Sequence, residues 1–295
     1  MKPLWRIARL TACVAAILLI GCKNAPLSEA RQAAEMGDAS AQLALGAIYD
    51  TGEMVPQDSA EAVRWFRKAA DQGNAKGQWS LGIMYDHGRG VSQDYAEAVR
   101  WYRKAADQGM AEAQSRLGFM YDLGRGVSQD YAEAARWDLK AAEQGKADAQ
   151  FSLGTKYELG LGVPKDYAEA VRWYRKGADQ GNAHCQFSLG SMYELDFGVS
   201  RDHAEAVRWY RKAADQGYAD GQFILGERYY KGLGAPKDYV QAYMWMNLAA
   251  SRAVGEDQKK YADQRDRLAG KMTAQQIAEA QRLAREWKPK PEGQR

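Results

Sequence analysis

The sequence predicts an all-α protein built from six stacked helical pairs, and two regularities support this prediction. Glycine recurs every 36 residues, and tryptophan recurs with the same spacing. The glycines are Gly46, Gly82, Gly118, Gly154, Gly190 and Gly226, and the tryptophans are Trp65, Trp101, Trp137, Trp173, Trp209 and Trp245. Because two unrelated residue types share one period, the chain contains six repeats, which we place at residues 38–253.

The N-terminus has the features of an export signal. Lys2, Arg6 and Arg9 precede a short apolar run at residues 10–20, which is too short to span a bilayer. The run ends at Gly21-Cys22, which resembles the bacterial lipobox. The resemblance implies a signal peptide at residues 1–21 and acylation of Cys22. Because Lys23 and Asn24 follow in place of aspartate, it also indicates an outer-membrane lipoprotein that faces the periplasm.

Residues 22–37 contain a lipidated N-terminus followed by a half-repeat. The segment at residues 27–37 is similar to the second half of a repeat, including Ala33-Ala34-Glu35-Met36-Gly37. We therefore expect it to cap the beginning of the stack, since solenoids need modified terminal units.

The first half of each repeat predicts an amphipathic helix. In the second repeat Asn74 precedes this helix as an N-cap and Gly88 follows it. Gln78, Leu81 and Tyr85 share one face. The repeated glycine in the helix interior costs roughly 1 kcal/mol relative to alanine. We therefore expect a neighbouring helix to approach the backbone at that point.

The loop between the two helices contains a Gly-x-Gly spacing, as in Gly88-Arg89-Gly90. No strand precedes it and it recurs in four repeats, so we interpret it as a turn with positive φ and not as a phosphate-binding loop.

The second half of each repeat predicts another helix, typified by residues 95–106. Asp94 and Glu97 stand three apart at its start, which predicts a capping box. Val99, Tyr102 and Ala106 lie on its apolar face, which one helical pair cannot bury alone. Stacking of successive pairs buries these faces continuously.

Two further helices are expected after the repeats, at about residues 256–269 and 273–287, within a C-terminal cap at residues 254–287. The second begins with a Thr273 to Gln276 capping-box pattern. Pro289 and Pro291 with polar neighbours predict a disordered tail at residues 288–295.

Charge and metal-ligand content exclude several function classes. Without Lys2, Arg6 and Arg9, 38 basic residues face 38 acidic ones, which argues against nucleic acid as a partner. His87, His184 and His203 are dispersed, so no metal site is expected. Cys185 occupies a column of alanine and glycine, which predicts a buried, inert thiol. We expect no cofactor and no small-molecule substrate.

The pattern L-G-x-x-Y-x-x-G-x-G-V-x-x-D-Y-x-x-A-x-x-W-Y at residues 81–102 resembles the Sel-one-like repeat, a relative of the tetratricopeptide repeat. The resemblance covers all six repeats. It implies a right-handed α-solenoid, a superhelix of antiparallel helical pairs whose first helices line a concave surface. It also implies an adaptor that binds a protein or peptide on that surface. A cysteine-rich branch of the family is linked with penicillin binding, and this chain lacks its cysteines.

Columns that vary among the repeats mark the expected partner-binding groove. One column is largely aromatic, a second is mixed, and a third is nearly all acidic. Aromatic anchors dominate many interfaces, and the acidic column would suit a basic partner segment. The candidate residues are Trp79, Ile83, Asp86, Phe119, Asp122, Phe151, Glu158, Phe187, Glu194 and Phe223. Whether the aromatic rings bind a partner or fill the core stays open at this point.

Two functions remain. A non-catalytic envelope scaffold is favoured because the sequence has no Gly-x-Ser-x-Gly elbow, no Ser-x-x-Lys pair and no nucleotide loop. The alternative is an envelope hydrolase or peptidoglycan-binding protein, β-lactamase-like or a regulator of cell-wall enzymes.

Overall fold

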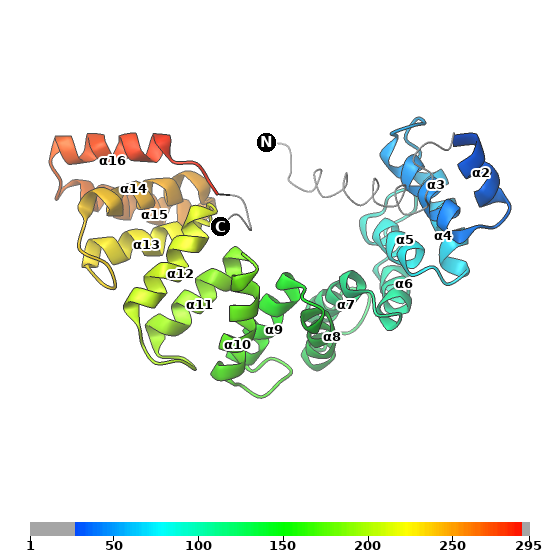
Figure 1. Ribbon diagram of the computed structural model, residues 1–295, viewed down its shortest axis with the longest axis horizontal. Helices are drawn as coiled ribbons and strands as arrows, with labels where there is room; N and C mark the ends of the chain where they lie inside the picture. Colours follow the sequence, from blue (N-terminus) through cyan, green and yellow to red (C-terminus); the bar gives the residue numbers. More distant parts are fainter. Residues whose placement is uncertain (1–26, 291–295) are drawn as a thin grey trace. The chain divides into compact units, whose positions relative to one another are not determined.

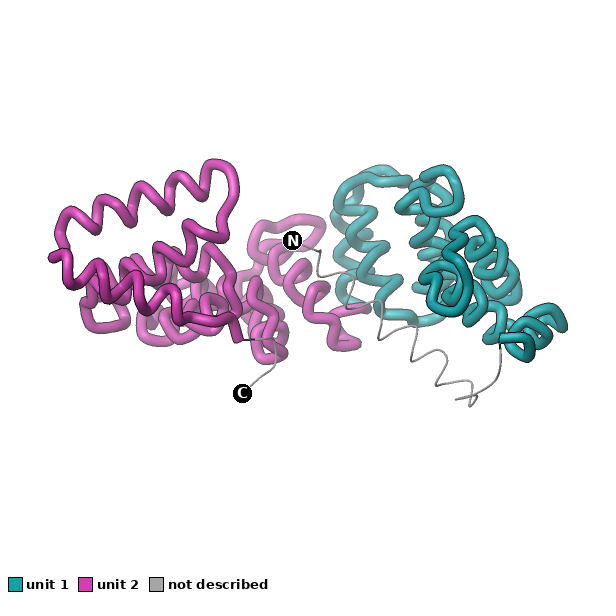
Figure 2. Tube along the Cα trace, turned by 90° about the horizontal axis from the view of Figure 1, so that it is seen from above, with its two compact units in different colours: residues 1–140 teal, residues 141–295 magenta. Residues whose placement is uncertain are grey.

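The computed structural model describes residues 27–290, which form 15 α-helices and no strand. The predicted signal peptide and Cys22 lie outside the described residues. The chain divides into two compact units, residues 1–140 and 141–295, with the boundary inside one helix (Figure 2). Each unit is a stack of helical pairs, so the fold is the predicted α-solenoid.

Each repeat contains two helices, which we call its first and second helix (Figure 1). The first helices are α3 (Ala39–Thr51), α5 (Ala75–His87), α7 (Ala111–Leu123), α9 (Ala147–Leu159), α11 (Ala183–Leu195) and α13 (Ala219–Lys231). The second helices are α4 (Ser59–Asp71), α6 (Tyr95–Asp107), α8 (Tyr131–Glu143), α10 (Tyr167–Asp179), α12 (His203–Asp215) and α14 (Tyr239–Arg252). Within each unit a first helix packs against the second helix of its own repeat and of the preceding repeat.

The repeated glycine allows the two helices of one repeat to approach closely. A Cβ on Gly82 would lie 2.6 Å from the ring of Tyr102 on α6, and one on Gly154 would lie 2.6 Å from the ring of Tyr174 on α10. No side chain fits there, which explains the recurrence of glycine despite its low helix propensity. The expected close approach of a neighbouring helix is confirmed, and the approaching group is an aromatic ring.

A ladder of buried glutamines links each repeat to the one before it. Gln78 Nε2 donates to the carbonyl of Ala70 (3.2 Å), and Gln78 Oε1 accepts from Gln108 Nε2 (2.8 Å). The same donation is made by Gln42, Gln114, Gln150, Gln186 and Gln222. Each such bond satisfies a buried carbonyl that the helix end leaves without a partner.

The expected capping box of the second helices is only half formed. Asp94 accepts from the amides of Ala96 and Glu97, at 2.9 and 3.0 Å. The Asp94 amide donates to the carbonyl of Tyr85 on the preceding helix (3.0 Å), so it is not available to Glu97. Glu97 pairs instead with Arg100 (3.1 Å). The first helix therefore takes the contact that a capping box would have made.

The loop glycines confirm the turn interpretation. Gly90 has φ 68°, and a Cβ on it would overlap the carbonyl of Ser59 in the preceding repeat. The second glycine of the Gly-x-Gly spacing thus permits both a left-handed backbone and close contact between repeats.

Helices at both ends close the stack. At the N-terminal end α2 (Leu27–Glu35) packs against α3, and its Ala34 carbonyl accepts from Gln42 (3.0 Å). At the C-terminal end α15 (Gly255–Ala269) and α16 (Ala274–Glu286) both pack on α14. The predicted capping box of α16 is present, with Thr273 and Gln276 bonded reciprocally.

The segment after α16 differs from the expected disordered tail over the residues described. Lys290 donates from its amide to the carbonyl of Asp215 (2.8 Å) and from Nζ to the carboxylate of Asp215 (2.7 Å). Two bonds to one residue at the end of α12 hold residues 288–290 against unit 2.

Cys185 is fully buried, and burial raises the pKa of its thiol to about 12. A Cβ on Gly177 would overlap Cys185 Sγ. Other repeats have alanine at the Gly177 position, so the smaller residue compensates for the larger one. Three repeats have alanine at both positions, which shows that the backbone accepts that combination.

We expect the effect of Gly177→Ala to change sign with residue 185. In the parent chain the added methyl should lower the free energy of unfolding by about 1–2 kcal/mol through overpacking. In the Cys185→Ala background it should raise that free energy by about 1 kcal/mol through helix propensity. A double-mutant cycle by urea denaturation measures the coupling. Additive effects would show that Gly177 does not accommodate Cys185.

Candidate functional site

The exposed sides of the first helices carry the residues that vary among repeats, and we call this surface the first-helix face of each unit. The outer positions of the second helices are instead nearly constant. Arginine recurs as Arg64, Arg100, Arg136, Arg172 and Arg208, each paired with a glutamate three residues earlier. Repetition of this kind is explained by helix stability, so recognition is better sought on the first-helix face.

The structure places the predicted groove residues in two groups. Unit 1 brings Trp79, Ile83 and Asp86 of α5 together with Phe119 and Asp122 of α7. Unit 2 carries the remaining residues on α9, α11 and α13: Phe151, Glu158, Phe187, Glu194 and Phe223.

Three rings of the aromatic column are half-buried against tyrosines of their own repeats. Trp79 lies 5.0 Å from the Tyr102 ring centroid. Phe151 and Tyr174 are 6.0 Å apart, and Phe187 and Tyr210 are 5.5 Å apart. Each ring therefore packs with one side and leaves part of its surface accessible, so packing and binding are compatible at these positions.

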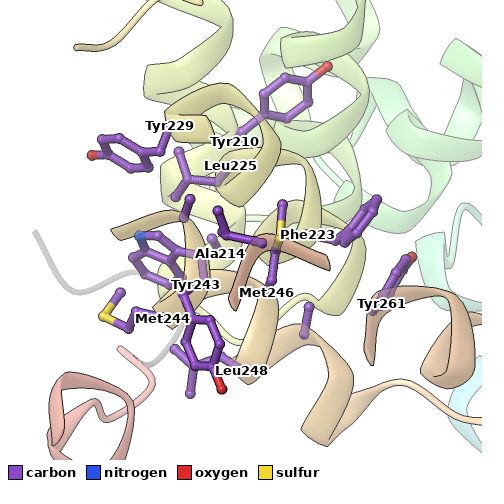
Figure 3. Close-up of a cluster of buried hydrophobic side chains, with 14 of the residues drawn as sticks. Tyr210, Ala214, Phe223, Leu225, Tyr229, Tyr243, Met244, Met246, Leu248 and Tyr261 are labelled. Atoms are coloured by element: carbon purple, nitrogen blue, oxygen red, sulfur yellow. The ribbon is translucent and has the colours of Figure 1, made fainter. Parts of the chain in front are cut away.

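Phe223 differs from the other rings, because it is buried (Figure 3). It stacks on Tyr261 of α15, with centroids 4.1 Å apart. Tyr261 in turn donates to Asp220 (2.5 Å). The C-terminal cap thus covers this end of the aromatic column, and Phe223 belongs to the core rather than to an open groove.

The acidic column is largely occupied by internal hydrogen bonds, which corrects the expectation of a free negative edge. The hydroxyls of Tyr102, Tyr174 and Tyr210 donate to Asp86 (3.0 Å), Glu158 (2.6 Å) and Glu194 (2.8 Å). Burial raises the pKa of each of these tyrosines, and the nearby carboxylate adds to that effect. Asp122 is half-buried.

Ion pairs engage the same carboxylates further. Asp86 is buried and accepts from Arg116 Nε (2.9 Å), and Arg228 pairs with Glu194 (2.6 Å). Asp86 therefore acts in the packing between the second and third repeats and is not presented to a partner.

Phe119 is the most exposed of the predicted aromatic residues, with 40% of its surface accessible. The guanidinium groups of Arg116 and Arg125 lie 4.9 and 5.8 Å from its ring centroid. Ile83, at the equivalent position of the preceding repeat, is half-buried. Sequence reasoning missed both arginines, although Arg116 replaces small or aliphatic residues in its column and was visible as an exception.

Catalytic or metal-binding groups do not assemble within residues 27–290. No cluster of three His, Cys, Asp or Glu side chains with metal-binding geometry occurs in this part of the chain. Over the same range, no helix has the length and apolarity needed to cross a membrane.

Known proteins resemble the chain over nearly its whole described length. The Sel1 repeat profile matches residues 39–74, 75–110, 111–146, 147–182, 183–218 and 219–254, each one residue later than the predicted repeats. No curated protein sequence matches the chain.

Two crystal structures are similar in sequence and fold. A protective antigen present in uropathogenic Escherichia coli strains, with an SLR fold, is 41% identical with a TM-score of 0.79. The match covers 89% of this chain and 56% of the antigen, so the chain spans little more than half of that protein. A Sel1 repeat protein from Oxalobacter formigenes is 33% identical with a TM-score of 0.68, covering 83% of this chain and 97% of the other.

Asp86→Asn should lower the free energy of unfolding by about 2–3 kcal/mol, because a buried carboxylate loses charge-assisted bonds to Tyr102 and Arg116. Asp50→Asn is the matched control. Phe66 replaces the tyrosine in that repeat, so only a 3.4 Å ion pair with Arg89 is weakened, which is worth less than about 1 kcal/mol. Urea denaturation of both variants gives the comparison. Equal, small losses would return Asp86 to the group of freely available acids.

Proposed function

The chain belongs to the Sel1 repeat family, and from this membership we propose that it is a non-catalytic scaffold whose first-helix face binds a protein partner. Proteins of this family are generally protein-interaction scaffolds. The proposal extends that general role to a particular face and to the bacterial envelope.

One observation carries the assignment to this face. The first helices expose aromatic and aliphatic rings that differ from repeat to repeat, while the glycines, glutamines and tryptophans required for stacking stay constant. Trp79, Phe119, Phe151 and Phe187 keep accessible surface although each belongs to a large apolar residue type. Partly exposed aromatic side chains on a rigid support are typical anchors of protein interfaces.

We further propose that acylation of Cys22 attaches the protein to the periplasmic side of the outer membrane. The support is the charged, apolar and small-residue order of residues 1–22. Several buried acyl chains at roughly 0.8 kcal/mol per CH₂ make such attachment stable. A tethered scaffold would hold its partner close to the membrane surface.

Photo-crosslinking in intact cells tests the binding face. A benzoylphenylalanine residue replacing Phe119 or Phe187 should crosslink one defined protein, because these side chains lie on the first-helix face. The same residue replacing Arg64 or Arg208 on the second helices should give no such product. The products are identified by mass spectrometry.

Two outcomes would contradict the scaffold. Crosslinking that occurs from the second helices and not from the first would move the interface to the other face. Hydrolysis of peptidoglycan or of a β-lactam by the purified full chain, abolished by substitution of one carboxylate, would support the enzyme alternative instead.

Cys22→Ser should abolish incorporation of an alkyne-labelled fatty acid and release the mature protein from the membrane fraction. Cys185→Ser is the control, because Cys185 is buried in the repeat stack and should not affect labelling. Persistence of the label in Cys22→Ser would refute the lipoprotein assignment.

A further inference from the structure

Arg125 carries a guanidinium without a carboxylate partner among residues 27–290, and comparison of two repeats explains why. Arg89 and Arg125 occupy equivalent loop positions 36 residues apart, as do Asp50 and Asp86. Arg89 pairs with Asp50, with Nη1 and Oδ2 3.4 Å apart. The equivalent partner of Arg125 would be Asp86.

Asp86 is already engaged by two other groups. Its Oδ2 accepts from the Tyr102 hydroxyl (3.0 Å) and from Arg116 Nε (2.9 Å). Arg116 is peculiar to the third repeat, since the equivalent residues are Ala44, Ser80, Ser152, Ser188 and Ile224. Arg116 thus displaces Arg125 from the acid that its position would otherwise reach.

The displaced guanidinium lies over two rings instead. It is 5.7 Å from the centroid of Tyr95 and 5.8 Å from that of Phe119. Because these contacts use the face of the guanidinium, its N–H groups remain able to donate in the plane. Arg125 is exposed, and so is Phe119.

A carboxylate bound in the plane of Arg125 would form charge-assisted hydrogen bonds, which are roughly twice as strong as neutral ones. An apolar side chain next to that carboxylate could cover the exposed part of Phe119, close to the second cation at Arg116. Two guanidinium groups around an exposed ring therefore match an acidic group adjacent to an apolar one.

We propose that unit 1 recognises a partner segment in which a carboxylate neighbours an apolar side chain, with the carboxylate on Arg125 and the apolar group on Phe119. This inference rests on the proposed function, and it names the chemistry of the partner. It replaces the basic segment expected from the acidic column with an acidic one, because that column is neutralised internally.

Selection from a random twelve-residue phage-displayed peptide library, with the purified full chain as bait, provides the test. Enriched peptides should contain aspartate, glutamate or a free terminal carboxylate beside a large apolar residue. Fluorescence anisotropy with synthetic copies of the enriched peptides should show about tenfold weaker binding to Arg125→Gln. The control Arg89→Gln should change binding less than about twofold, because its arginine is already paired.

Two further measurements separate binding from folding. Arg125→Gln should leave the thermal midpoint unchanged, because no ion pair is lost. Raising the salt concentration from about 50 to 500 mM should weaken binding to the parent chain more than to Arg125→Gln, since screening acts on the charged contact.

The outcomes distinguish this inference from the function it rests on. Enriched peptides that are basic or uncharged, bind equally to Arg125→Gln and are lost on Phe119→Ala would overturn the acidic chemistry and keep the scaffold. Peptides insensitive to both Arg125→Gln and Phe119→Ala would overturn the proposed recognition site on unit 1. A lack of enrichment over uncoated wells would also overturn it.

Discussion

The packing of an aromatic ring over a helix glycine is the contact from which the rest of each repeat follows. With Gly82 beneath it, the Tyr102 ring lies close to the α5 backbone, and its hydroxyl reaches Asp86 at the next turn. That carboxylate can then accept from Arg116 in the following repeat. A missing side chain at one position thus arranges a chain of polar contacts between two repeats, and one result is an arginine left with unused donors.

The same contact separates the two faces of each helical pair. Glycine, glutamine and tryptophan columns are committed to stacking, because each meets a partner in the same or the preceding repeat. Positions that point away from that seam carry no such constraint. Their side chains can differ from repeat to repeat without loss of the fold, and Trp79, Phe119 and Phe187 show that they do. Variation within one chain is therefore a physical guide to where recognition is possible.

Most of the fold could be predicted from the sequence because its signals are local and repeated. The repeat limits, the two helices per repeat, the α16 capping box and the buried Cys185 all follow from spacing and residue type. The half-formed capping box could not be predicted, since it depends on the Tyr85 carbonyl reaching Asp94 across the loop. The burial of Phe223 likewise depends on Tyr261, which lies 38 residues further along, outside the repeat register.

The candidate site was harder to predict, because its charge depends on competition between groups. The acidic column suggested a negative surface when counted by residue, yet tyrosine hydroxyls and arginines use much of its capacity. Whether Arg125 or Arg116 pairs with Asp86 is decided by distances of a few tenths of a nanometre, which periodicity does not encode. Composition can identify the columns, while coordinates are needed to learn which charges are spent.

The glutamine ladder ends at the sixth repeat, where Arg252 stands in the place of the donating glutamine. The Oε1 of Gln222 is buried without a hydrogen-bond partner within the described part of the chain, and Trp287 lies beside Arg252 at 4.4 Å. A duplicated cassette of 36 residues would find matching amides on both sides if inserted between the first five repeats. Joined after the sixth, it would meet an incompatible junction. The protein can therefore lengthen in evolution from its interior, while its carboxyl end acts as a permanent terminus.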